Sequence, residues 1–495
     1  MPMRMNRIRP GIPRSQNFSM DYETVIGLEV HVHLKTKTKV FCGCSTEFGN
    51  EANSQVCPVC LGFPGSLPVL NKVALDYAIK AALALNCKVQ EYTKFDRKNY
   101  FYPDLPKNYQ ISQYDLPLSR DGFLDIYLDG KNKRIGIRRV HLEEDAGKLI
   151  HKEDISLVDF NRTGIPLLEI VSQPDINSPQ EAYEYLTALK SILEYLEISD
   201  CDMEKGSLRC DANISIKEKS QTELGVKTEL KNMNSFKAAK EALAFEIERQ
   251  GELLDKGKAI IQETRLWDAK ELKTLSMRTK EEAMDYHYFP EPDLPPFVIT
   301  DKKIEEIKKA IPELPQEKKL RFMKEYGLSE YEAKVLVLSK RGAECAEERI
   351  KAYPDKNKKP IVNFLIGPLL SEANLRNVGI ADLNVSAHDL VELVEFVNTD
   401  TISNLVSKSV LSEMIESREA SASIIKRKNL IQISDTDVLK NQAEEVIKEN
   451  PKSVQDYQGG KNNALMFLVG QVMKKTKGKA NPKVVQEILR RLLKK

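Results

Sequence analysis

The chain has 495 residues, of which 41% are hydrophobic and 30% are charged, as in a globular protein of two to four domains. Its 75 basic and 73 acidic residues leave a net charge of +2, so any nucleic-acid surface must be local. No apolar run reaches about 18 residues, which excludes a transmembrane helix, and no membrane partner is expected.

The first 20 residues contain four arginines and no acidic residue, and they lack the apolar stretch of a secretory signal. We predict a disordered leader over 1–20, with an upstream start codon or an organelle transit peptide as alternatives. Four of the eight cysteines cluster between 42 and 60, which is not a disulfide framework and indicates a reducing compartment. We therefore expect a cytoplasmic protein rather than one of an organelle matrix.

The stretch from Tyr22 to Leu34, YETVIGLEVHVHL, is predicted to be a β-strand. Successive side chains of a strand point to opposite faces. One face is apolar throughout, with Ile26, Leu28, Val30, Val32 and Leu34. The other face carries Glu29, His31 and His33. Such a strand has its back in a core and its front in a cavity, which we take as the start of an active site; a solvated edge strand is the alternative.

The next motif pairs cysteines as C-x-C and C-x2-C, and its members are Cys42, Cys44, Cys57 and Cys60. Four thiolates on tight turns suit a tetrahedral zinc ion with no open position, so the predicted site is structural. Four reduced thiols in a loop are one alternative. A zinc-dependent hydrolase is another, but it needs an open coordination position.

A helix is predicted after the N-cap Asn71. The segment from Lys94 to Pro117 follows it, with four tyrosines and three prolines among charged residues. Because proline fixes φ, we predict an ordered loop rather than a regular element, and such loops are usually functional. A surface loop without a function is the alternative.

Two further strands are predicted at 134–150 and 159–174. In the first, Glu143 shares a face with His141, whereas Glu144 shares the other with Val140 and Leu142. The second is apolar with Glu169 embedded in it. Ser178, Pro179 and Glu181 then form a helix start signature, and the helix extends to about 196.

The segments LRCDANISI and VKTELK, within 206–236, alternate apolar and polar residues and predict a hairpin with one buried face. The exposed face would carry two carboxylates among three cations: Arg209, Asp211, Lys227, Glu229 and Lys231. This mixture suits a metal ion beside a polyphosphate. Salt bridges on a solvated sheet are the alternative.

Beyond a helix at 235–256, the prolines of 262–300 predict an irregular segment and a domain boundary near 300. The remaining chain is helical. From Met473 to Lys495 it contains nine lysines or arginines against one glutamate, which favours contact with a phosphate backbone over a merely solvated terminus.

The sequence lacks the P-loop, dinucleotide-binding and hydrolase motifs. The residues themselves predict metal-dependent phosphoryl chemistry with Mg²⁺ held by carboxylates. A nucleic acid is one candidate substrate.

Nine stretches between 23 and 297 closely resemble, in order, the GatB/GatE family of tRNA-dependent amidotransferase B subunits. They are ETVIGLEVHVHLKTKTK, CPVCLGFPGSLPVLN, KFDRKNYFYPDLPKNYQISQYD, HLEEDAGK, DFNRTGIPLLEIVS, GSLRCDANISI, KTELKNMNSF, QETRLWD and YFPEPDLPP. The end of the chain, ALMFLVGQVMKKTKGKANP, resembles the YqeY-like tail of that family.

The resemblance implies an α+β fold: a β-sheet-rich cradle with flanking helices, a small helical domain and an all-α tail. We place these domains at 21–300, 301–353 and 354–495, with the zinc insert at 42–60. The implied activity is that of a glutamine-hydrolysing amidotransferase, class EC 6.3.5.-, in which two partner chains, the amidase (A) and a small chain (C), complete a heterotrimer. With ATP and Mg²⁺ it phosphorylates the side-chain carboxylate of misacylated Glu-tRNA(Gln) or Asp-tRNA(Asn), and ammonia from the amidase then displaces the phosphate. A non-catalytic tRNA-binding scaffold is the alternative.

The resemblance also implies roles for individual residues. The implied magnesium ligands are Glu29, His31, Glu143, Glu144 and Glu229, and the expected catalytic residues are Glu29, His31, Glu144, Asp211 and Glu229. The candidates for phosphate contacts are Arg209, Lys227 and Lys231. The ammonia path would involve Lys98, Tyr100 and Lys107. Two residues depart from the family pattern, His33 and His287, and we assign neither a role.

Overall fold

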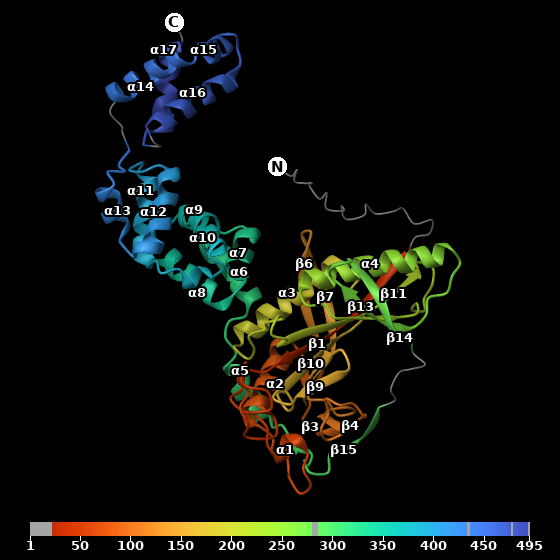
Figure 1. The fold of residues 1–495 in the computed structure, drawn as a ribbon. Coiled ribbons are helices and arrows are strands. Elements are labelled where there is room, and N and C mark those ends of the chain that lie inside the picture. Colours follow the sequence, from red (N-terminus) through yellow and green to blue (C-terminus); the bar gives the residue numbers. More distant parts are fainter. Residues whose placement is uncertain (1–21, 280–285, 433–435, 477–478, 494–495) are drawn as a thin grey trace. The chain divides into compact units, whose positions relative to one another are not determined.

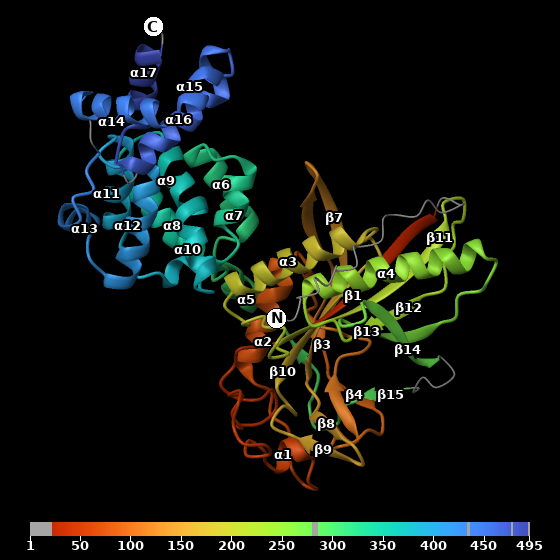
Figure 2. The same ribbon diagram turned by 45° about the horizontal axis from the view of Figure 1, so that its top comes forward.

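The computed structural model describes residues 22–279, 286–432, 436–476 and 479–493 (Figures 1 and 2). The expected leader at 1–20 lies outside them. By their internal contacts the residues form two compact units, Met1–Leu314 and Pro315–Lys495. Among the described residues, no helix is long and apolar enough to cross a membrane.

A nine-stranded sheet is the centre of the first unit. Its strands, in spatial order, are β14 (Lys273–Thr279), β13 (Glu263–Asp268), β12 (Thr228–Lys231), β11 (Leu208–Glu218), β1 (Tyr22–His33), β10 (Pro166–Ser172), β7 (Lys131–Glu144), β6 (Ser119–Leu128) and β2 (Lys88–Val89). Neighbours are antiparallel except β12 and β13, which are parallel. The predicted strand at 22–34 and the hairpin in 206–236 are confirmed.

Helices cover one face of this sheet, and Figures 1 and 2 show α3 (Pro179–Tyr195) and α4 (Phe236–Asp255) lying across it. Ile26, Leu28 and Val30 of β1 are buried against them in one core, and burial of each side chain stabilises the fold by about 1.5–3 kcal/mol. The predicted caps are also present: Asn71 caps α2 (Lys72–Ala84), and Ser178 caps α3. Because the helices cover only one face, the polar residues of the strands share the other.

Three small sheets complete the first unit. They are β15 (His287–Pro290) with β4 (Asp96–Asn99) and β5 (Tyr109–Ser112), β16 (Phe297–Val298) with β3 (Tyr92–Thr93), and the hairpin of β8 (Lys148–Lys152) with β9 (Ile155–Asp159). The segment from Lys94 to Pro117 was therefore wrongly predicted as loop only, since it contains β4 and β5. Likewise 262–300 is not irregular, since β13 to β16 lie in it. Both strands β4 and β15 are four residues long, and each exists because it pairs with the other from a distant part of the chain.

Two short helices belong to this unit as well, α1 (Pro58–Leu61) beside the cysteines and α5 (Asp301–Lys309). Helix α5 packs against α2, where Lys303 Nζ lies 2.7 Å from Asp76 Oδ1 and Ile307 enters the core. The first residues after 300 therefore pack with the sheet unit.

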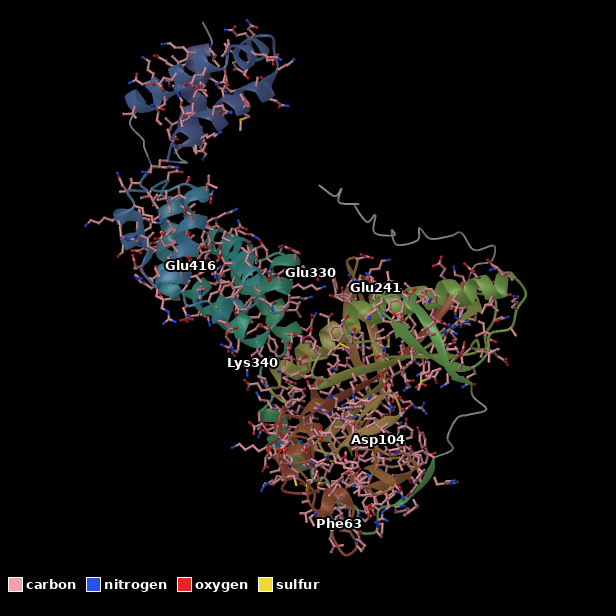
Figure 3. All side chains as sticks on the ribbon, viewed as in Figure 1. Phe63, Asp104, Glu241, Glu330, Lys340 and Glu416 are labelled. Atoms are coloured by element: carbon pink, nitrogen blue, oxygen red, sulfur yellow. The ribbon has the colours of Figure 1, made fainter. Side chains whose placement is uncertain are left out.

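The second unit is helical. Its elements are α6 (Pro315–Tyr326), α7 (Glu330–Leu336), α8 (Lys340–Ala352), α9 (Lys359–Phe364), the π-turn η2 (Leu365–Leu369), α10 (Leu370–Leu375), the 3₁₀ turn η3 (Ile380–Asp382), α11 (Ala387–Asn398), α12 (Asn404–Ser417), α13 (Ser421–Arg427), α14 (Thr436–Glu449), α15 (Pro451–Gln458), α16 (Asn462–Lys475) and α17 (Pro482–Leu493). The last four helices enclose a hydrophobic core of their own. In Figure 3, Glu330, Lys340 and Glu416 mark this unit, while Phe63 and Asp104 mark the sheet unit. The predicted α+β class with a helical C-terminal region is confirmed.

Candidate functional site

The register of the large sheet brings polar residues of four strands into one row on its open face. His31 of β1 pairs with Glu169 of β10 on one side and with Arg209 of β11 on the other, and Glu169 pairs with His141 of β7. Directly opposed residues of antiparallel strands point to the same face. Four chemically active side chains from distant parts of the sequence therefore lie together.

One group in this row has the chemistry of a metal site. His31 Nε2 lies 3.5 Å from Glu29 Oε1 and 3.5 Å from Glu169 Oε2, and the ligand atoms of all three residues lie within 4.8 Å of one another. Two carboxylates and one imidazole fit a magnesium ion that keeps waters in its other positions.

A second group shares Glu169 with the first. His141 Nε2 lies 3.4 Å from Glu143 Oε2 and 3.5 Å from Glu169 Oε2, and all three residues are buried. Glu143 also accepts a hydrogen bond of 2.8 Å from Ser112 Oγ and lies 4.0 Å from His31. Glu169 is thus the carboxylate that joins both groups.

Burial and neighbouring charges shift the pKa values of these groups in different directions. Burial favours the neutral form of Glu169, but the imidazoles of His141 and His31 outweigh it and hold the pKa of Glu169 well below its usual range. Burial and the Glu169 charge raise the pKa of Glu29. Against its own burial, the carboxylates of Glu169 and Glu143 raise the pKa of His141 to about 9. Three carboxylates facing two imidazoles form a site that a cation would stabilise.

The hairpin side of the same face carries an ion-pair network. Lys231 Nζ lies 2.5 Å from Asp211 Oδ2 and 3.0 Å from Glu229 Oε1, and Thr264 Oγ1 donates to Glu229 Oε2 at 2.8 Å. Asp211 stands directly opposite Glu29 in the register. The network therefore borders the first group through Asp211.

Asp145, the residue after Glu144, is a buried carboxylate with three side-chain partners. Its Oδ2 atom accepts from His33 Nε2 at 2.6 Å and lies 3.0 Å from Arg209 Nη2 and 3.5 Å from Arg162 Nε. Although burial opposes its ionisation, Arg209 and Arg162 hold the pKa of Asp145 well below its usual range. His33, a departure from the family pattern, serves here as a carboxylate partner.

The sheet of β15, β4 and β5 covers the carboxylates from the other side. Register and contacts place Lys98 and Tyr288 on the face with Ser112, toward Glu143, and the Lys98 ammonium lies 4.6 Å from the centre of the Tyr286 ring. Burial opposes the charge of Lys98, yet Glu143 raises its pKa. The Tyr100 ring contacts Tyr286 at 5.3 Å between centroids. Lys98 and Tyr100 thus stand over the site.

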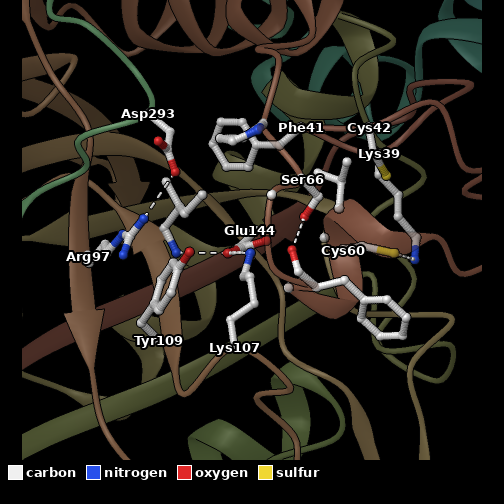
Figure 4. Close-up of a pocket in the computed structure, with 17 residues that line it drawn as sticks. Lys39, Phe41, Cys42, Cys60, Ser66, Arg97, Lys107, Tyr109, Glu144 and Asp293 are labelled. Atoms are coloured by element: carbon white, nitrogen blue, oxygen red, sulfur yellow. Dashed lines mark hydrogen bonds and ion pairs between the residues drawn. The ribbon is translucent and has the colours of Figure 1, made fainter.

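The opposite face of this small sheet borders a cavity of about 280 Å³, shown in Figure 4. Glu144 lies in its wall, pairs there with Lys107 and accepts from the backbone N–H of Ile111 at 2.9 Å. Arg97 and Tyr109 line it from β4 and β5. Two consecutive residues of β7 therefore point to opposite sides. Glu143 faces the carboxylate groups, and Glu144 faces the cavity.

The four cysteines meet at the same cavity, which Cys42 and Cys60 help to line. The sulfur atoms of Cys42, Cys44, Cys57 and Cys60 lie within 4.8 Å of one another. A hydrogen bond from Cys42 and, to a smaller extent, the buried Lys39 ammonium, 3.7 Å from Cys60 Sγ, together lower the pKa of Cys60 to about 4. Four soft ligands with one favoured thiolate fit a zinc ion with no open position.

Comparison with known proteins decides the family. Residues 24–305 match the family model described as the GatB/GatE catalytic domain, and residues 345–493 match the one described as the GatB domain. The chain belongs to the GatB/GatE family. Three relatives carry the name of the B subunit of aspartyl/glutamyl-tRNA(Asn/Gln) amidotransferase. Those of Carboxydothermus hydrogenoformans, Thermoanaerobacter sp. and Clostridium tetani are 57%, 53% and 51% identical, and the alignments cover 95%, 96% and 95% of this chain and 98%, 100% and 98% of each relative.

Not all ligands expected from the GatB/GatE resemblance come together. Glu29 and His31 lie in one group, and Glu143 lies in the second group, 4.0 Å from His31. Glu144 is turned to the cavity because successive strand residues face opposite sides. Glu229 lies on the correct face but is paired with Lys231 and Thr264. In this structure Glu169 completes the group.

The expected phosphate contacts also differ in their surroundings. Arg209 is held by Asp145, and Lys231 by Asp211 and Glu229. Lys227 is exposed just before β12, and His287 is exposed on β15. Sequence reasoning missed Glu169, His141 and Asp145 as site residues, although an acid embedded in an apolar strand was a usable signal for Glu169.

Proposed function

We propose that this chain is the B subunit of a tRNA-dependent amidotransferase that converts misacylated Glu-tRNA(Gln) or Asp-tRNA(Asn) into the amide form. One observation carries the proposal: the Glu29, His31 and Glu169 group lies among cations on the open face of the catalytic domain that identifies the family. The names of the relatives support the substrate and the multisubunit enzyme. We also propose that the protein acts in the bacterial cytoplasm, since the relatives named here come from bacteria.

In the proposed reaction, an oxygen of the substrate carboxylate attacks the γ-phosphorus of ATP, ADP leaves, and an acyl phosphate results. Ammonia then attacks the acyl carbon, phosphate leaves and the nitrogen loses a proton. Glu29, His31 and Glu169 would hold Mg²⁺, which supplies charge neutralisation for the transferred phosphoryl group. His141 and Ser112 orient Glu169 and Glu143 through contacts of 3.5 and 2.8 Å. Asp211 and Lys231 would lie beside the nucleotide.

Ammonia would come from the amidase, the A partner, and the small C partner would be the third chain. The cavity supports this path, since it carries the pair of Lys107 with Glu144 on one side of the small sheet. Lys98 and Tyr100 stand on the carboxylate side. Ammonia that enters the cavity would therefore have to pass the small sheet of β15, β4 and β5 to reach the carboxylates.

Zinc on the four cysteines would fix the shape of the cavity and take no part in the chemistry. The basic tail would bind the tRNA backbone.

The decisive experiment measures ATP hydrolysis by the full chain with its A and C partners, Mg²⁺ and Glu-tRNA(Gln). We expect hydrolysis that depends on the misacylated tRNA, that is absent with Gln-tRNA(Gln) and that is lost in Glu29→Gln and Glu169→Gln. The exposed Glu271→Gln is the matched control. If the wild type binds the tRNA without hydrolysing ATP, the chain is a scaffold and the proposal is wrong.

A further inference from the structure

A second row on the open face of the sheet runs beside the metal-ligand row. In it Arg139 of β7 pairs with Val171 of β10, Val171 pairs with Glu29, and Glu29 pairs with Asp211. Neighbouring strands lie about 4.8 Å apart, so the backbones at Arg139 and Glu29 are about 10 Å apart. Only the short side chain of Val171 lies between them in this row. The two long charged side chains therefore stand on either side of Val171, next to Glu169.

Arg139 is not fully bound within the chain. Its Nη2 atom lies 3.4 Å from Glu169 Oε1, a long contact, and its Nε atom is shielded from solvent with no hydrogen-bond partner among the described residues. The Nε–H and Nη2–H of an arginine point the same way and form a fork that binds two oxygens of one anion. Arg97 uses its fork in this way on Glu291, with both distances at 2.8 Å. The fork of Arg139 has one weak partner and one open donor.

Two other cations of this face, Arg209 and Lys231, have closer partners. Arg209 lies 3.0 Å from Asp145, and Lys231 lies 2.5 Å from Asp211 and 3.0 Å from Glu229. Either would have to leave a carboxylate to bind a phosphate. Arg139 has a donor, Nε–H, that no carboxylate occupies, so an anion oxygen bound there would displace no ion pair.

We propose that Arg139 binds the phosphoryl group in transfer, next to Glu29, His31 and Glu169, and is a catalytic residue for carboxylate phosphorylation. This inference about Arg139 rests on the amidotransferase function proposed above. The anion is a tetrahedral or planar phosphorus group with negative oxygens, which a planar guanidinium fork recognises. As charge develops on these oxygens in the transition state, the open donor gains its partner, so the contact is stronger there than in the ground state.

The test compares Arg139→Gln and Arg139→Lys with Arg138→Gln in the full chain with its A and C partners. Arg138 is the adjacent residue, is exposed and lies at the irregularity that leaves it without a partner residue in β10, so its replacement removes the same charge from a neighbouring position and serves as the control. We expect Arg139→Gln to lower the rate of ATP hydrolysis dependent on misacylated tRNA by about 10²–10³-fold, since one transition-state donor is lost. Arg139→Lys should recover part of the rate, because it returns the charge without the fork.

Two binding measurements separate this role from others. Arg139→Gln should weaken binding of ADP with aluminium fluoride, which mimics the transferred group, by at least tenfold and leave binding of ADP alone unchanged. The affinity for Mn²⁺, measured by electron paramagnetic resonance, should stay within twofold. If Mn²⁺ affinity falls as much as the rate, Arg139 only orients Glu169 and the inference is wrong.

If the wild type is active and Arg139→Gln hydrolyses ATP at the same rate, the inference is wrong and the proposed function still stands. A wild type without tRNA-dependent hydrolysis contradicts the proposed function itself. If Arg139→Gln fails to fold, the Arg139→Lys variant still decides, since a rate and an analogue affinity equal to those of wild type contradict the fork.

Discussion

At the scale of single residues, the ionised side chains in the interior are held by specific partners. Glu169 is held by two imidazoles, Asp145 by Arg209 and His33, and Glu144 by Lys107. A buried charge without such a partner would cost several kcal/mol, so each of these pairs fixes the position of the carboxylate that it contacts. The same physics stabilises the helical unit, where Glu347 of α8 lies 2.7 Å from Arg321 of α6.

We predict that Glu347→Gln destabilises the helical unit in a pH-dependent way. The hydrogen bond from Arg321 lowers the pKa of Glu347 from 4.5 to about 2, so its contribution is fully present above pH 4.5 and is lost as the pH falls toward 2. At pH 7 we expect a loss of about 2–3 kcal/mol in the free energy of unfolding, measured with urea on the full chain. Near pH 2 wild type and variant should converge.

Glu344→Gln is the matched control, because Glu344 is an exposed residue of the same helix. It should change the free energy of unfolding by less than about 0.5 kcal/mol at either pH. A difference between wild type and Glu347→Gln that is independent of pH would contradict the ion pair as its cause.

At the scale of elements, the three-stranded sheet of β15, β4 and β5 is the wall between two spaces. Ser112 reaches Glu143 on one side, and the backbone of Ile111 reaches Glu144 on the other. The loop of the four cysteines closes the second space, since Cys42 and Cys60 line it. A change in the loop should therefore alter the cavity while the carboxylate groups keep their positions.

We predict that Cys60→Ser removes one zinc ion per chain, measured by mass spectrometry of the metal, and lowers the midpoint of thermal unfolding. Amidation with glutamine as the nitrogen donor should fall, whereas ATP hydrolysis and amidation with added ammonium should be largely kept, because we propose that ammonia from the partner passes through this cavity. Cys345→Ser in the helical unit should keep the zinc. Equal loss with both nitrogen donors would argue that the cysteines take part in the chemistry.

At the scale of the whole molecule, the sheet unit and the last four helices have separate hydrophobic cores. The last four helices have a separate core, so their surface can change without effect on the sheet. Lys483, Arg490 and Arg491 of α17 are exposed, whereas Lys475 of α16 is paired with Glu445 and Glu449. These three exposed cations of α17 are available to a phosphate backbone.

We predict that a chain with Lys483, Arg490 and Arg491 all replaced by Gln has a raised KM for aminoacyl-tRNA and an unchanged kcat. The slope of log Kd against log salt should fall by about 2–3, as expected for three lost phosphate contacts. Lys356→Gln, at an exposed position in the same unit, should change neither. An unchanged salt slope in the triple variant would remove the tail from the tRNA-binding surface.

The sequence by itself determined the elements whose pattern is local. The alternation in YETVIGLEVHVHL predicts the strand and its polar face, the caps Asn71 and Ser178 predict helix starts, and the cysteine spacing predicts the sulfur group. Each of these signals lies within a few residues of the structure it specifies.

Only the tertiary structure decided which polar residues meet. Pairing of β10 with both β1 and β7 places Glu169 between His31 and His141, and the alternation of consecutive residues separates Glu144 from Glu143. The strands β4 and β15 are too short to be recognised alone and form because each supplies the backbone hydrogen bonds of the other. Register across a sheet is a relation between distant segments, and a single segment does not contain it.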